Sequence, residues 1–487
     1  MMSLKLLFFI NFLPFTLFAQ TELTEKQLRE DYTIFKNVLT GSHPGLYKYT
    51  TKAEWDSIFS DFEAEITHIN NAQDFFKKIS ALALNVRDGH LRILHPTMDT
   101  IPTMFPLLVK IIDGKLFTDT GDFGIPLGSE IIAIDRLKSQ ELIQRMLKYA
   151  PSDGYNTTKK HRQIEFEFGI LLYYELGAKS GYTVTYHTPD HRIHTSKVKS
   201  QSFQSIGIRN PYRSSYFSSY HRKVDKVEHA KHHIQQKLPF VYFIDSINTA
   251  VLTVNSFGID PQEFKSEIID IFKEIKRQKA TSLIIDVRQN IGGYRANAIT
   301  LFSYLSDRPF KQRISETAIT SGLIEADYKI HTMSGYTEFF NDFFANAENR
   351  NGRWILTTDK AEETMKPYKR PFKGNTYVLI GGNTFSAGSA FALSAKNNPQ
   401  IKLIGEETGG GYYFHTGQFP VFYKLPHSKI VVNMSLVNIN HYVKDNSVPE
   451  GSGILPDYEV TLTQKDLING TDGPLDYIIK KLKYSKQ

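Results

Sequence analysis

NTYVLIGGNTFSAGSAFALSAKNNPQIKLIGEETGGG, residues 375–411, is the stretch that decides the fold. Its apolar residues 376–380 predict a buried strand, which Gly381 and Gly382 end. The alanine-rich residues 389–395 then predict a buried helix, and residues 401–404 a second strand before a glycine-rich turn. A strand, a glycine turn, a helix and another strand in succession indicate an α/β fold.

Ser386 stands where the turn passes into this helix, and the small residues Ala387 and Gly388 follow it. A serine hydroxyl on such a tight turn is exposed, and the N–H groups at a helix start can bind a developing oxyanion. The position therefore suits a nucleophile. It equally suits a serine that only caps the helix, and this stretch alone leaves both interpretations open.

The composition indicates a large globular protein. Its 487 residues are 41% hydrophobic and 13% aromatic, which is enough for two or three domains with bulky cores. The net charge is +7, but the basic residues are dispersed apart from residues 222–233, so a solvated surface is favoured over nucleic-acid binding. The chain has no cysteine, which excludes a disulfide, a thiol nucleophile and a cysteine-ligated zinc site.

Residues 1–19 have the pattern of a signal peptide. Lys5 supplies the positive charge, residues 6–18 are mostly apolar, and the small Ala19 follows them. The apolar run is short for a membrane span and is interrupted by Asn11 and Pro14. We therefore expect an exported protein, periplasmic or extracellular, that keeps no stable membrane span after cleavage.

Residues 20–98 predict a helical N-terminal domain, with helical patterns before Gly41, over about 52–69 and over about 72–86. Gly89 is a natural stop for the third helix, and the chain becomes extended from Leu91. His90 therefore lies on a corner between a helix and a strand. Histidine is the side chain best suited to take a hydroxyl proton near neutral pH, although most single loop histidines carry no chemistry.

Residues 99–200 predict a second module. Strands over 105–112 and 115–118 flank a turn at Asp113 and Gly114, and residues 127–135 read as a strand before a helix over 139–149. The run 127–135 resembles part of a PDZ domain, a fold that binds peptides by adding a strand to a sheet edge. The loop with which PDZ domains bind a terminal carboxylate is not visible, so peptide binding here stays open.

Residues 201–238 are polar and basic, and we interpret them as a linker or surface excursion. His229, His232 and His233 lie close together there, but the carboxylates that would complete a metal site do not accompany them.

Residues 239–487 predict the main α/β domain. Strands over 250–254 and 282–287 alternate with helices over about 261–279 and 295–305, and a turn at Gly292 and Gly293 precedes the second helix. The spacing of a dinucleotide-binding glycine motif is missing. We expect an irregular insertion over 308–374, strands over 419–425 and 429–436, and a final helix over about 474–483.

Separated stretches of the chain together resemble the serine peptidases of the carboxy-terminal processing and tricorn-core type. They are Asp88-Gly89-His90, the run DVRQNIGG at 286–293, TFSAGS at 384–389, GEETGG at 405–410 and the closing run from Glu450 to Asp457. Their order and spacing cover nearly the whole mature chain. The resemblance implies a crotonase-like catalytic domain of ββα units, preceded by a helical cap and a PDZ-like domain.

The family has two catalytic styles. One pairs the serine with a lysine about two dozen residues later, but Gly411 stands at that place here. The other, the tricorn-core style, uses an N-terminal histidine and a late glutamate. The resemblance therefore implies Ser386 as the nucleophile, His90 as the base and Glu450 as a supporting acid. A serine precedes the histidine in the tricorn-core pattern, whereas this chain has Gly89.

The remaining expectations concern the oxyanion, the rival bases and the substrate. The N–H groups of Gly292, Gly293 and Ala387 lie in turns of the kind that can hold an oxyanion. His415 and Lys424 are the alternative bases, and such a lysine would have to be buried to be neutral. We expect a polypeptide substrate and neither a cofactor nor a metal. An esterase or amidase, or a ligand-binding module without catalysis, are the alternatives.

Overall fold

The computed structural model describes residues 22–96, 101–215, 238–332, 336–356 and 363–484. The expected signal peptide and the three clustered histidines at 229, 232 and 233 lie outside these ranges. No helix in the described ranges is long and apolar enough to cross a membrane.

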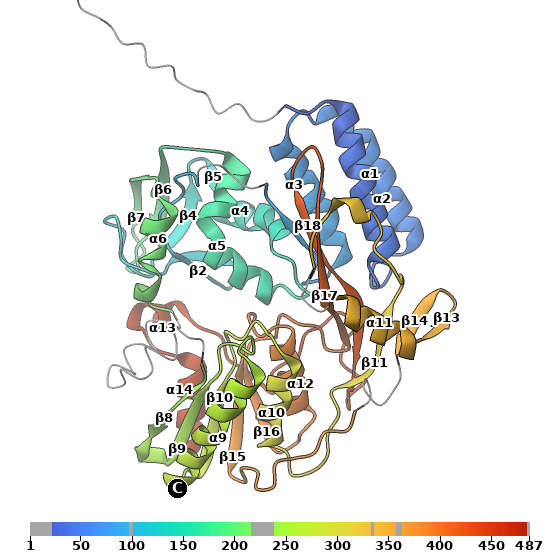
Figure 1. Ribbon diagram of the computed structural model, residues 1–487. Coiled ribbons are helices and arrows are strands. Elements are labelled where there is room, and N and C mark those ends of the chain that lie inside the picture. The colour runs from blue at the N-terminus through green and yellow to red at the C-terminus, as the bar shows by residue number, and fades with distance from the viewer. Residues whose placement is uncertain (1–21, 97–100, 216–237, 333–335, 357–362, 485–487) are drawn as a thin grey trace, which may run out of the picture.

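The N-terminal unit is helical, as the sequence predicts, and forms the blue group in Figure 1. Its helices are α1 (Glu25–Ser42), α2 (Lys52–Glu65) and α3 (Ala72–Ala83). Thr24 and Thr51 begin the first two with capping boxes, in which the threonine and the third helical residue satisfy each other's backbone N–H groups. After α3, Arg87 adopts a left-handed conformation with φ of 56°, so the helical path ends before Gly89.

The second unit is an antiparallel sheet with the strand order β2-β3-β4-β6-β7, and β5 pairs with β4. Its strands are β2 (Val109–Ile112), β3 (Lys115–Thr118), β4 (Glu130–Ile134), β5 (Leu137–Lys138), β6 (Gly181–His187) and β7 (Ile193–Lys199). Two helices pack against this sheet, α4 (Ser139–Met146) and α5 (Thr158–Leu176). The sequence predicts α4 but not α5, which turns out to border the candidate site.

The third unit holds a mostly parallel sheet with the order β19-β16-β15-β10-β9-β8. Its strands are β8 (Phe240–Ile244), β9 (Thr249–Thr253), β10 (Ser282–Asp286), β15 (Asn375–Ile380), β16 (Ile401–Gly405) and β19 (Tyr458–Glu459), and only the pair β8–β9 is antiparallel. The mixed α/β class predicted from the sequence is confirmed.

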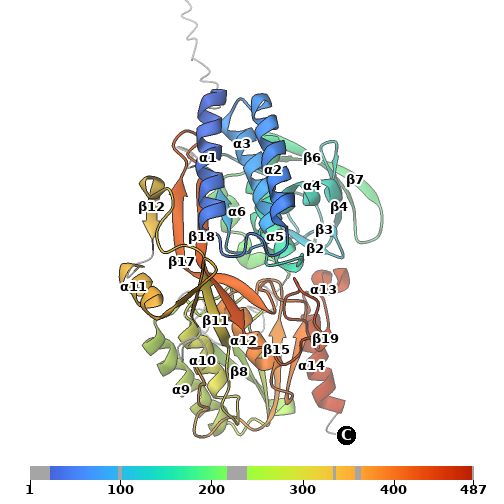
Figure 2. The same cartoon turned by 90° about the vertical axis from the view of Figure 1, so that its right-hand side faces the viewer.

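Both faces of this sheet are covered by helices (Figures 1 and 2). Residues such as Leu252, Ile285 and Val378 point toward the helices α9 (Pro261–Arg277), α10 (Arg295–Ser303) and α12 (Ala387–Lys396). The alternate residues, such as Val251 and Ile284, pack against α14 (Gly473–Tyr484) on the other face. Because these strands are buried on both faces, their sequences are continuous apolar runs rather than alternating ones.

A third sheet joins the first and last parts of the chain. Its order is β12-β17-β18-β11-β14-β13, and β1 (Arg92–Leu94) pairs with β18. The other strands are β11 (Arg313–Ala318), β12 (Lys329–Thr332), β13 (Glu348–Arg350), β14 (Arg353–Leu356), β17 (Phe414–Lys424) and β18 (Val431–His441). The prediction of an irregular insertion over 308–374 is therefore wrong, because β11 finds its partner more than a hundred residues later, in β18. The same insertion contains α11 (Tyr336–Asn346).

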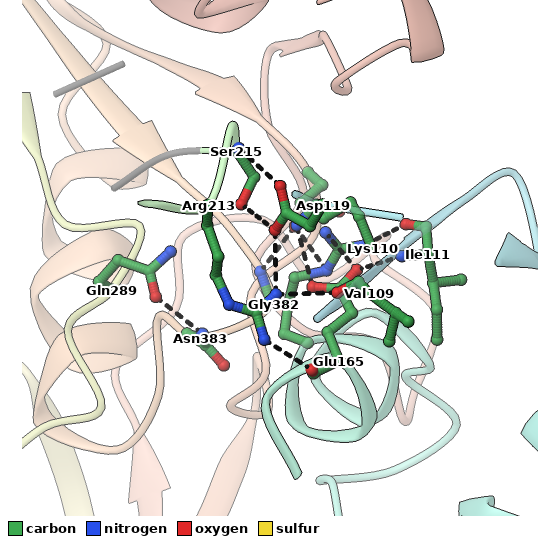
Figure 3. A network of polar contacts seen from close by, with 12 residues as sticks. Val109, Lys110, Ile111, Asp119, Glu165, Arg213, Ser215, Gln289, Gly382 and Asn383 are labelled. Carbon is green, nitrogen blue, oxygen red and sulfur yellow. Dashed lines mark hydrogen bonds and ion pairs between the residues drawn. The ribbon is translucent and has the colours of Figure 1, made fainter. Parts of the chain in front are cut away.

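Residues 201–215 are not a linker. They form α6 (Phe203–Gly207) and a short turn, and then pack into the second unit. Arg213 is 5% exposed and donates to the carbonyl of Val109, to Asp119 and to the carbonyl of Glu165 (Figure 3). The polar composition that suggested a solvated segment serves an internal network here.

Side chains cover the free edge of β2 (Figure 3). Glu165 of α5 accepts the N–H of Ile111 at 2.7 Å and also binds the ammonium of Lys110 at 2.9 Å. Arg162 donates to the carbonyl of Ile111 at 2.8 Å. The same arginine lies 3.6 Å from Glu406, which accepts the N–H of Gly382. One network thus links the edge of β2 to the turn that precedes Ser386.

Candidate active site

Ser386 occupies a strained turn at the start of α12. Its φ of 53° and ψ of −122° are rare for a residue with a side chain, and such a conformation costs about 1–3 kcal/mol. Its hydroxyl makes no capping hydrogen bond, which excludes the interpretation of a simple helix cap. A Cβ at Gly292 would lie 2.7 Å from the Cβ of Ser386, so only glycine allows the neighbouring loop to approach this closely.

His90 lies against Ser386. Its Nε2 is 3.2 Å from the serine Oγ, although 296 positions separate the two residues in the sequence. The strand β1 begins two residues after His90 and pairs with β18, which holds this corner against the third sheet. The ring of Phe385 packs against the imidazole, with 4.5 Å between their centroids. The structure therefore brings together the two residues that the sequence proposed as nucleophile and base.

Burial keeps the imidazole of His90 neutral. Desolvation lowers the pKa of His90 to about 4, with a smaller lowering from the charge of Lys159 and an opposing effect from Asp88. At neutral pH the ring is therefore uncharged, and Nε2 can accept the proton of the serine hydroxyl.

Two of the three expected oxyanion donors are available. The N–H of Gly292 already donates to the side chain of Asn290 at 2.9 Å, so it is committed to holding the loop. Gly293 follows it in a conformation with φ of 132°, and Ala387 opens α12, where a first-turn N–H has no acceptor within the helix. Within the described ranges, neither of these two N–H groups donates to the protein.

Glu450 is not brought to His90. Its carboxylate forms an ion pair with Lys48 at 2.5 Å, and its side chain is 58% exposed. Within the described part of the chain, the Nδ1 atom of His90 is buried and has no hydrogen-bond partner. The supporting role that the resemblance implies for Glu450 is therefore not formed in this structure.

A different carboxylate, Asp88, lies beneath His90, and sequence reasoning did not assign it. One oxygen, Oδ1, accepts the backbone N–H of His90 at 2.7 Å. The other, Oδ2, is bonded to His43 Nε2 at 2.7 Å and accepts the hydroxyl of Thr416 at 2.6 Å. Burial would raise the pKa of Asp88, but interactions with His43 above all, including its hydrogen bond, and the hydrogen bond of Thr416 lower it to about 2.

Asp153, which precedes α5, ties the three units together at the site. Its Oδ1 accepts the N–H of Gly89 at 2.7 Å, and its Oδ2 accepts the N–H of Gly411 at 3.0 Å. Burial and the charge of Asp88 raise the pKa of Asp153 to about 7, against the effect of the two N–H donors. A Cβ at Gly89 would lie 2.6 Å from the ring of Phe385, which explains why this position holds glycine where the tricorn-core pattern has serine.

The rival bases do not bind the serine. His441 donates from Nδ1 to the carbonyl of Tyr412 at 2.9 Å, so its Nε2 accepts the proton on Nδ1 of His415 at 2.6 Å. The ring of His415 stacks on that of His90 with 5.6 Å between centroids. Burial lowers the pKa of His415 well below its usual value. Lys424 is exposed at the end of β17, which removes the burial that a neutral lysine would need.

Comparison with known proteins points to the same chemistry. Residues 248–460 match peptidase family S41. The chain carries an S41 peptidase domain. It is therefore a serine-type peptidase, as the sequence resemblance to the carboxy-terminal processing and tricorn-core enzymes implies. No curated protein matches the sequence.

Two solved structures, with TM-scores of 0.64 and 0.63, share the fold of this chain. Mature CPAF complexed with lactacystin is 15% identical with a TM-score of 0.64, and the match covers 95% of this chain and 98% of that one. Mature CPAF is also 15% identical, with a TM-score of 0.63 over 94% and 97% of the two chains. The tricorn protease is 14% identical with a TM-score of 0.41, over 95% of this chain and 37% of the tricorn chain.

Asp88, His90 and Asp153 also form the one group in the described ranges whose ligand atoms could surround a metal, within 4.8 Å of one another. All four carboxylate oxygens already accept N–H or O–H donors of the protein. Hydrogen bonding therefore accounts for this cluster, and a metal would have to displace it.

Proposed function

We propose that this S41 chain is an exported endopeptidase in which Ser386 is the nucleophile and His90 is the general base. The observation that carries the proposal is the distance of 3.2 Å between His90 Nε2 and Ser386 Oγ, on a strained turn that directs the hydroxyl at the imidazole. A serine hydroxyl is unreactive near neutral pH until a neighbouring base removes its proton, and a neutral imidazole is such a base.

The reaction proceeds in two halves. Ser386 Oγ attacks the scissile carbonyl carbon while its proton passes to Nε2 of His90, and the carbonyl oxygen becomes an oxyanion held by the N–H groups of Gly293 and Ala387. His90 then gives the proton to the leaving amine, and an acyl-enzyme remains. Water enters, loses its proton to His90 and releases the acid product, after which Ser386 recovers its proton.

The finer description of the scaffold belongs to the same proposal. We assign the parallel sheet with its helices to a crotonase-like catalytic domain, within the expected boundaries of 239–487. The helical unit is its cap, and the unit with the antiparallel sheet is the PDZ-like domain expected over residues 99–200. Export rests on Lys5, the apolar residues 6–18 and Ala19.

Single substitutions test the nucleophile and the base. We expect Ser386→Ala and His90→Ala each to lower turnover of casein and of a short chromogenic peptide by roughly a thousand-fold or more. The double variant should be little worse than either one, because the two side chains act as a unit. Lys424→Ala, at an exposed position far along β17, serves as the matched control and should keep wild-type turnover. Folding of each variant is checked by circular dichroism.

Labelling separates the peptidase from its alternatives. A fluorophosphonate should label the wild-type chain at Ser386 and fail to label Ser386→Ala. Activity on esters with none on peptides would contradict the endopeptidase proposal. Near-normal peptide cleavage by His90→Ala, together with loss in Lys424→Ala, would replace the histidine base by a lysine.

A further inference from the structure

The Nδ1 atom of His90 needs a hydrogen-bond acceptor, and none of the residues assigned to the reaction so far provides one. For Nε2 to accept the serine proton, the neutral ring must carry its own proton on Nδ1. This Nδ1 is buried and makes no hydrogen bond within the described ranges. A buried donor without a partner is unfavourable, and it leaves the tautomer of the base undefined.

The nearest acidic oxygen to this nitrogen belongs to Asp88. Its Oδ1 lies 3.9 Å from His90 Nδ1, which is too long for a hydrogen bond but within the range of an ion pair. A movement of the ring by about 1 Å closes the gap to ordinary hydrogen-bond length. Hydrogen bonds of catalytic groups are often long in the free enzyme and shorten when substrate binds.

Asp88 is held in place as an anion by the residues behind it. Gly45 donates its N–H to Nδ1 of His43 at 3.2 Å, so the proton of that ring lies on Nε2 and is donated to Asp88 Oδ2. Thr416 donates a second bond to the same oxygen. The carboxylate is therefore fixed from behind by residues of the N-terminal unit and of β17, with Oδ1 turned toward His90.

We propose that Asp88, rather than Glu450, is the carboxylate that positions His90 during catalysis. It accepts the Nδ1–H of the imidazole, which fixes the tautomer with a free Nε2, and it stabilises the imidazolium that forms when Ser386 loses its proton. The proton on Nδ1 stays there throughout, and Asp88 itself remains ionised. This inference rests on the proposed function, because it assumes that His90 is the base.

Other charged groups around His90 do not take this role. Lys159 of α5 carries a positive charge, which opposes an imidazolium. Asp153 holds the backbone N–H groups of Gly89 and Gly411, whereas the ion pair that the described residues form with the ring of His90 is made by Asp88. His415 stacks on the face of the His90 ring rather than meeting its edge, and its own Nδ1–H donates a hydrogen bond to His441. Asp88 is the one of these groups with an oxygen near Nδ1.

The decisive experiment compares Asp88→Asn with Glu450→Gln by steady-state kinetics between pH 4 and pH 9. We expect Asp88→Asn to lower kcat by roughly a hundred-fold to ten-thousand-fold, as for an aspartate that orients a catalytic histidine. Since the charge of Asp88 raises the pKa of His90, its removal should also move the acid limb of kcat/KM to lower pH. Glu450→Gln should keep both kcat and the acid limb near wild type.

Two further variants separate a positioning role from a structural one. Thr416→Val removes a hydrogen bond to Asp88 but leaves its charge, so the acid limb should stay in place even if kcat falls somewhat. Asp88→Glu keeps the charge and is used if Asp88→Asn does not fold; it should retain the wild-type acid limb.

The proposal is overturned if Glu450→Gln loses kcat by a hundred-fold or more, or if folded Asp88→Asn stays within three-fold of wild type. Failure of the proposed function has a different signature, because Ser386→Ala or His90→Ala would then remain active. With those two variants inactive and Asp88→Asn normal, only the inference about Asp88 fails.

Discussion

Ser386 and Gly292 lie so close together that a side chain on the glycine would collide with the serine. Gly292 has φ of 108°, a value that residues with a side chain rarely adopt, and its N–H is bonded to Asn290. The glycine thereby lets the loop after β10 lie directly against Ser386, the proposed nucleophile. Gly293, the next residue, can then present its N–H to the substrate. The geometry of the reacting groups is thus set by a residue that carries no side chain.

Replacing Gly292 by alanine should therefore impair catalysis specifically. The new Cβ would lie 2.7 Å from the Cβ of Ser386 and 3.0 Å from the N–H nitrogen of Ala387, so the serine or the oxyanion donor must move. We expect kcat to fall by roughly a hundred-fold, the usual cost of a lost oxyanion donor. Gly322→Ala is the control, because no atom lies within 4 Å of a Cβ there. Equal activity of the two variants would contradict this account.

The helix α5 connects the second unit to the catalytic turn. Its residue Glu165 satisfies the edge of β2, and Arg162 reaches from that edge to Glu406 beside Gly382. A peptide that added a strand to β2 would have to displace both side chains and Arg213 as well. The edge of β2 is therefore already occupied in this structure, and the second unit acts here as a brace for the turn before Ser386.

The brace can be tested through Glu165. Its replacement by alanine leaves the buried N–H of Ile111 without an acceptor and removes the partner of Lys110. We expect the free energy of unfolding to fall by about 3 kcal/mol, the typical cost of breaking a buried ion pair on one side. Urea denaturation measures the change. Glu141→Ala is the control, because its pair with Arg145 is exposed and should contribute less than about 1 kcal/mol. A similar small loss in both variants would show that the network contributes little.

Each of the three units of the molecule contributes residues to the candidate active site. The helical unit supplies Asp88 and His90, the second unit supplies Asp153, and the third supplies Ser386. Behind them, His415 and His441 are buried on β17 and β18, where neighbouring strands bring them together. The proposed catalytic centre is therefore also a place where titratable groups are concentrated in the interior.

This concentration predicts how stability depends on pH. Burial lowers the pKa of His90 and of His441 to about 4, and that of His415 further, whereas unfolded histidine titrates near pH 6.5. Between these values the unfolded chain binds more protons, so the stabilisation is complete above about pH 6.5 and is lost as the pH falls toward 4. Each such histidine contributes up to about 1.4 kcal/mol per pH unit, and the raised pKa of Asp153 offsets part of this.

Urea midpoints at pH 7.5 and pH 5 measure this dependence. The midpoint should be lower at pH 5, and His441→Gln should reduce the difference between the two. The exposed His194 provides the control, since His194→Gln should leave the difference unchanged. An unfolding midpoint that does not vary between the two pH values would contradict the assignment of neutral, buried histidines.

Local sequence patterns predict much of this architecture. The helices of the first unit, the alternation from β9 to β16 and the position of Ser386 all follow from periodicity, capping residues and glycine turns. The same sequence patterns do not predict α5, because the apolar residues of this helix are not confined to one face. Phe168 and Leu172 are buried, whereas Phe166 is 66% exposed and lines the surface. No single amphipathic stripe marks this helix.

The supporting residues could not be predicted because contacts between distant segments create them. Asp88 and Asp153 are ordinary loop aspartates in the sequence, and only burial under three units gives them their partners. The position of Glu450 in the closing run suggested it as the supporting acid, but its side chain is exposed and pairs with Lys48. The aspartate two residues before His90 was the one available signal for the carboxylate that the structure places beneath the ring.

The separation of 296 positions between His90 and Ser386 has a consequence for the timing of biosynthesis. A ribosome adds about 5–20 residues per second, so roughly 15–60 s pass after His90 emerges before the serine has been made. The strand β18, which pairs with β1 beside His90, is completed later still. A nascent chain therefore contains no assembled dyad of the proposed kind, and if these two residues carry the reaction, proteolytic competence arises only when nearly the entire polypeptide has been translated.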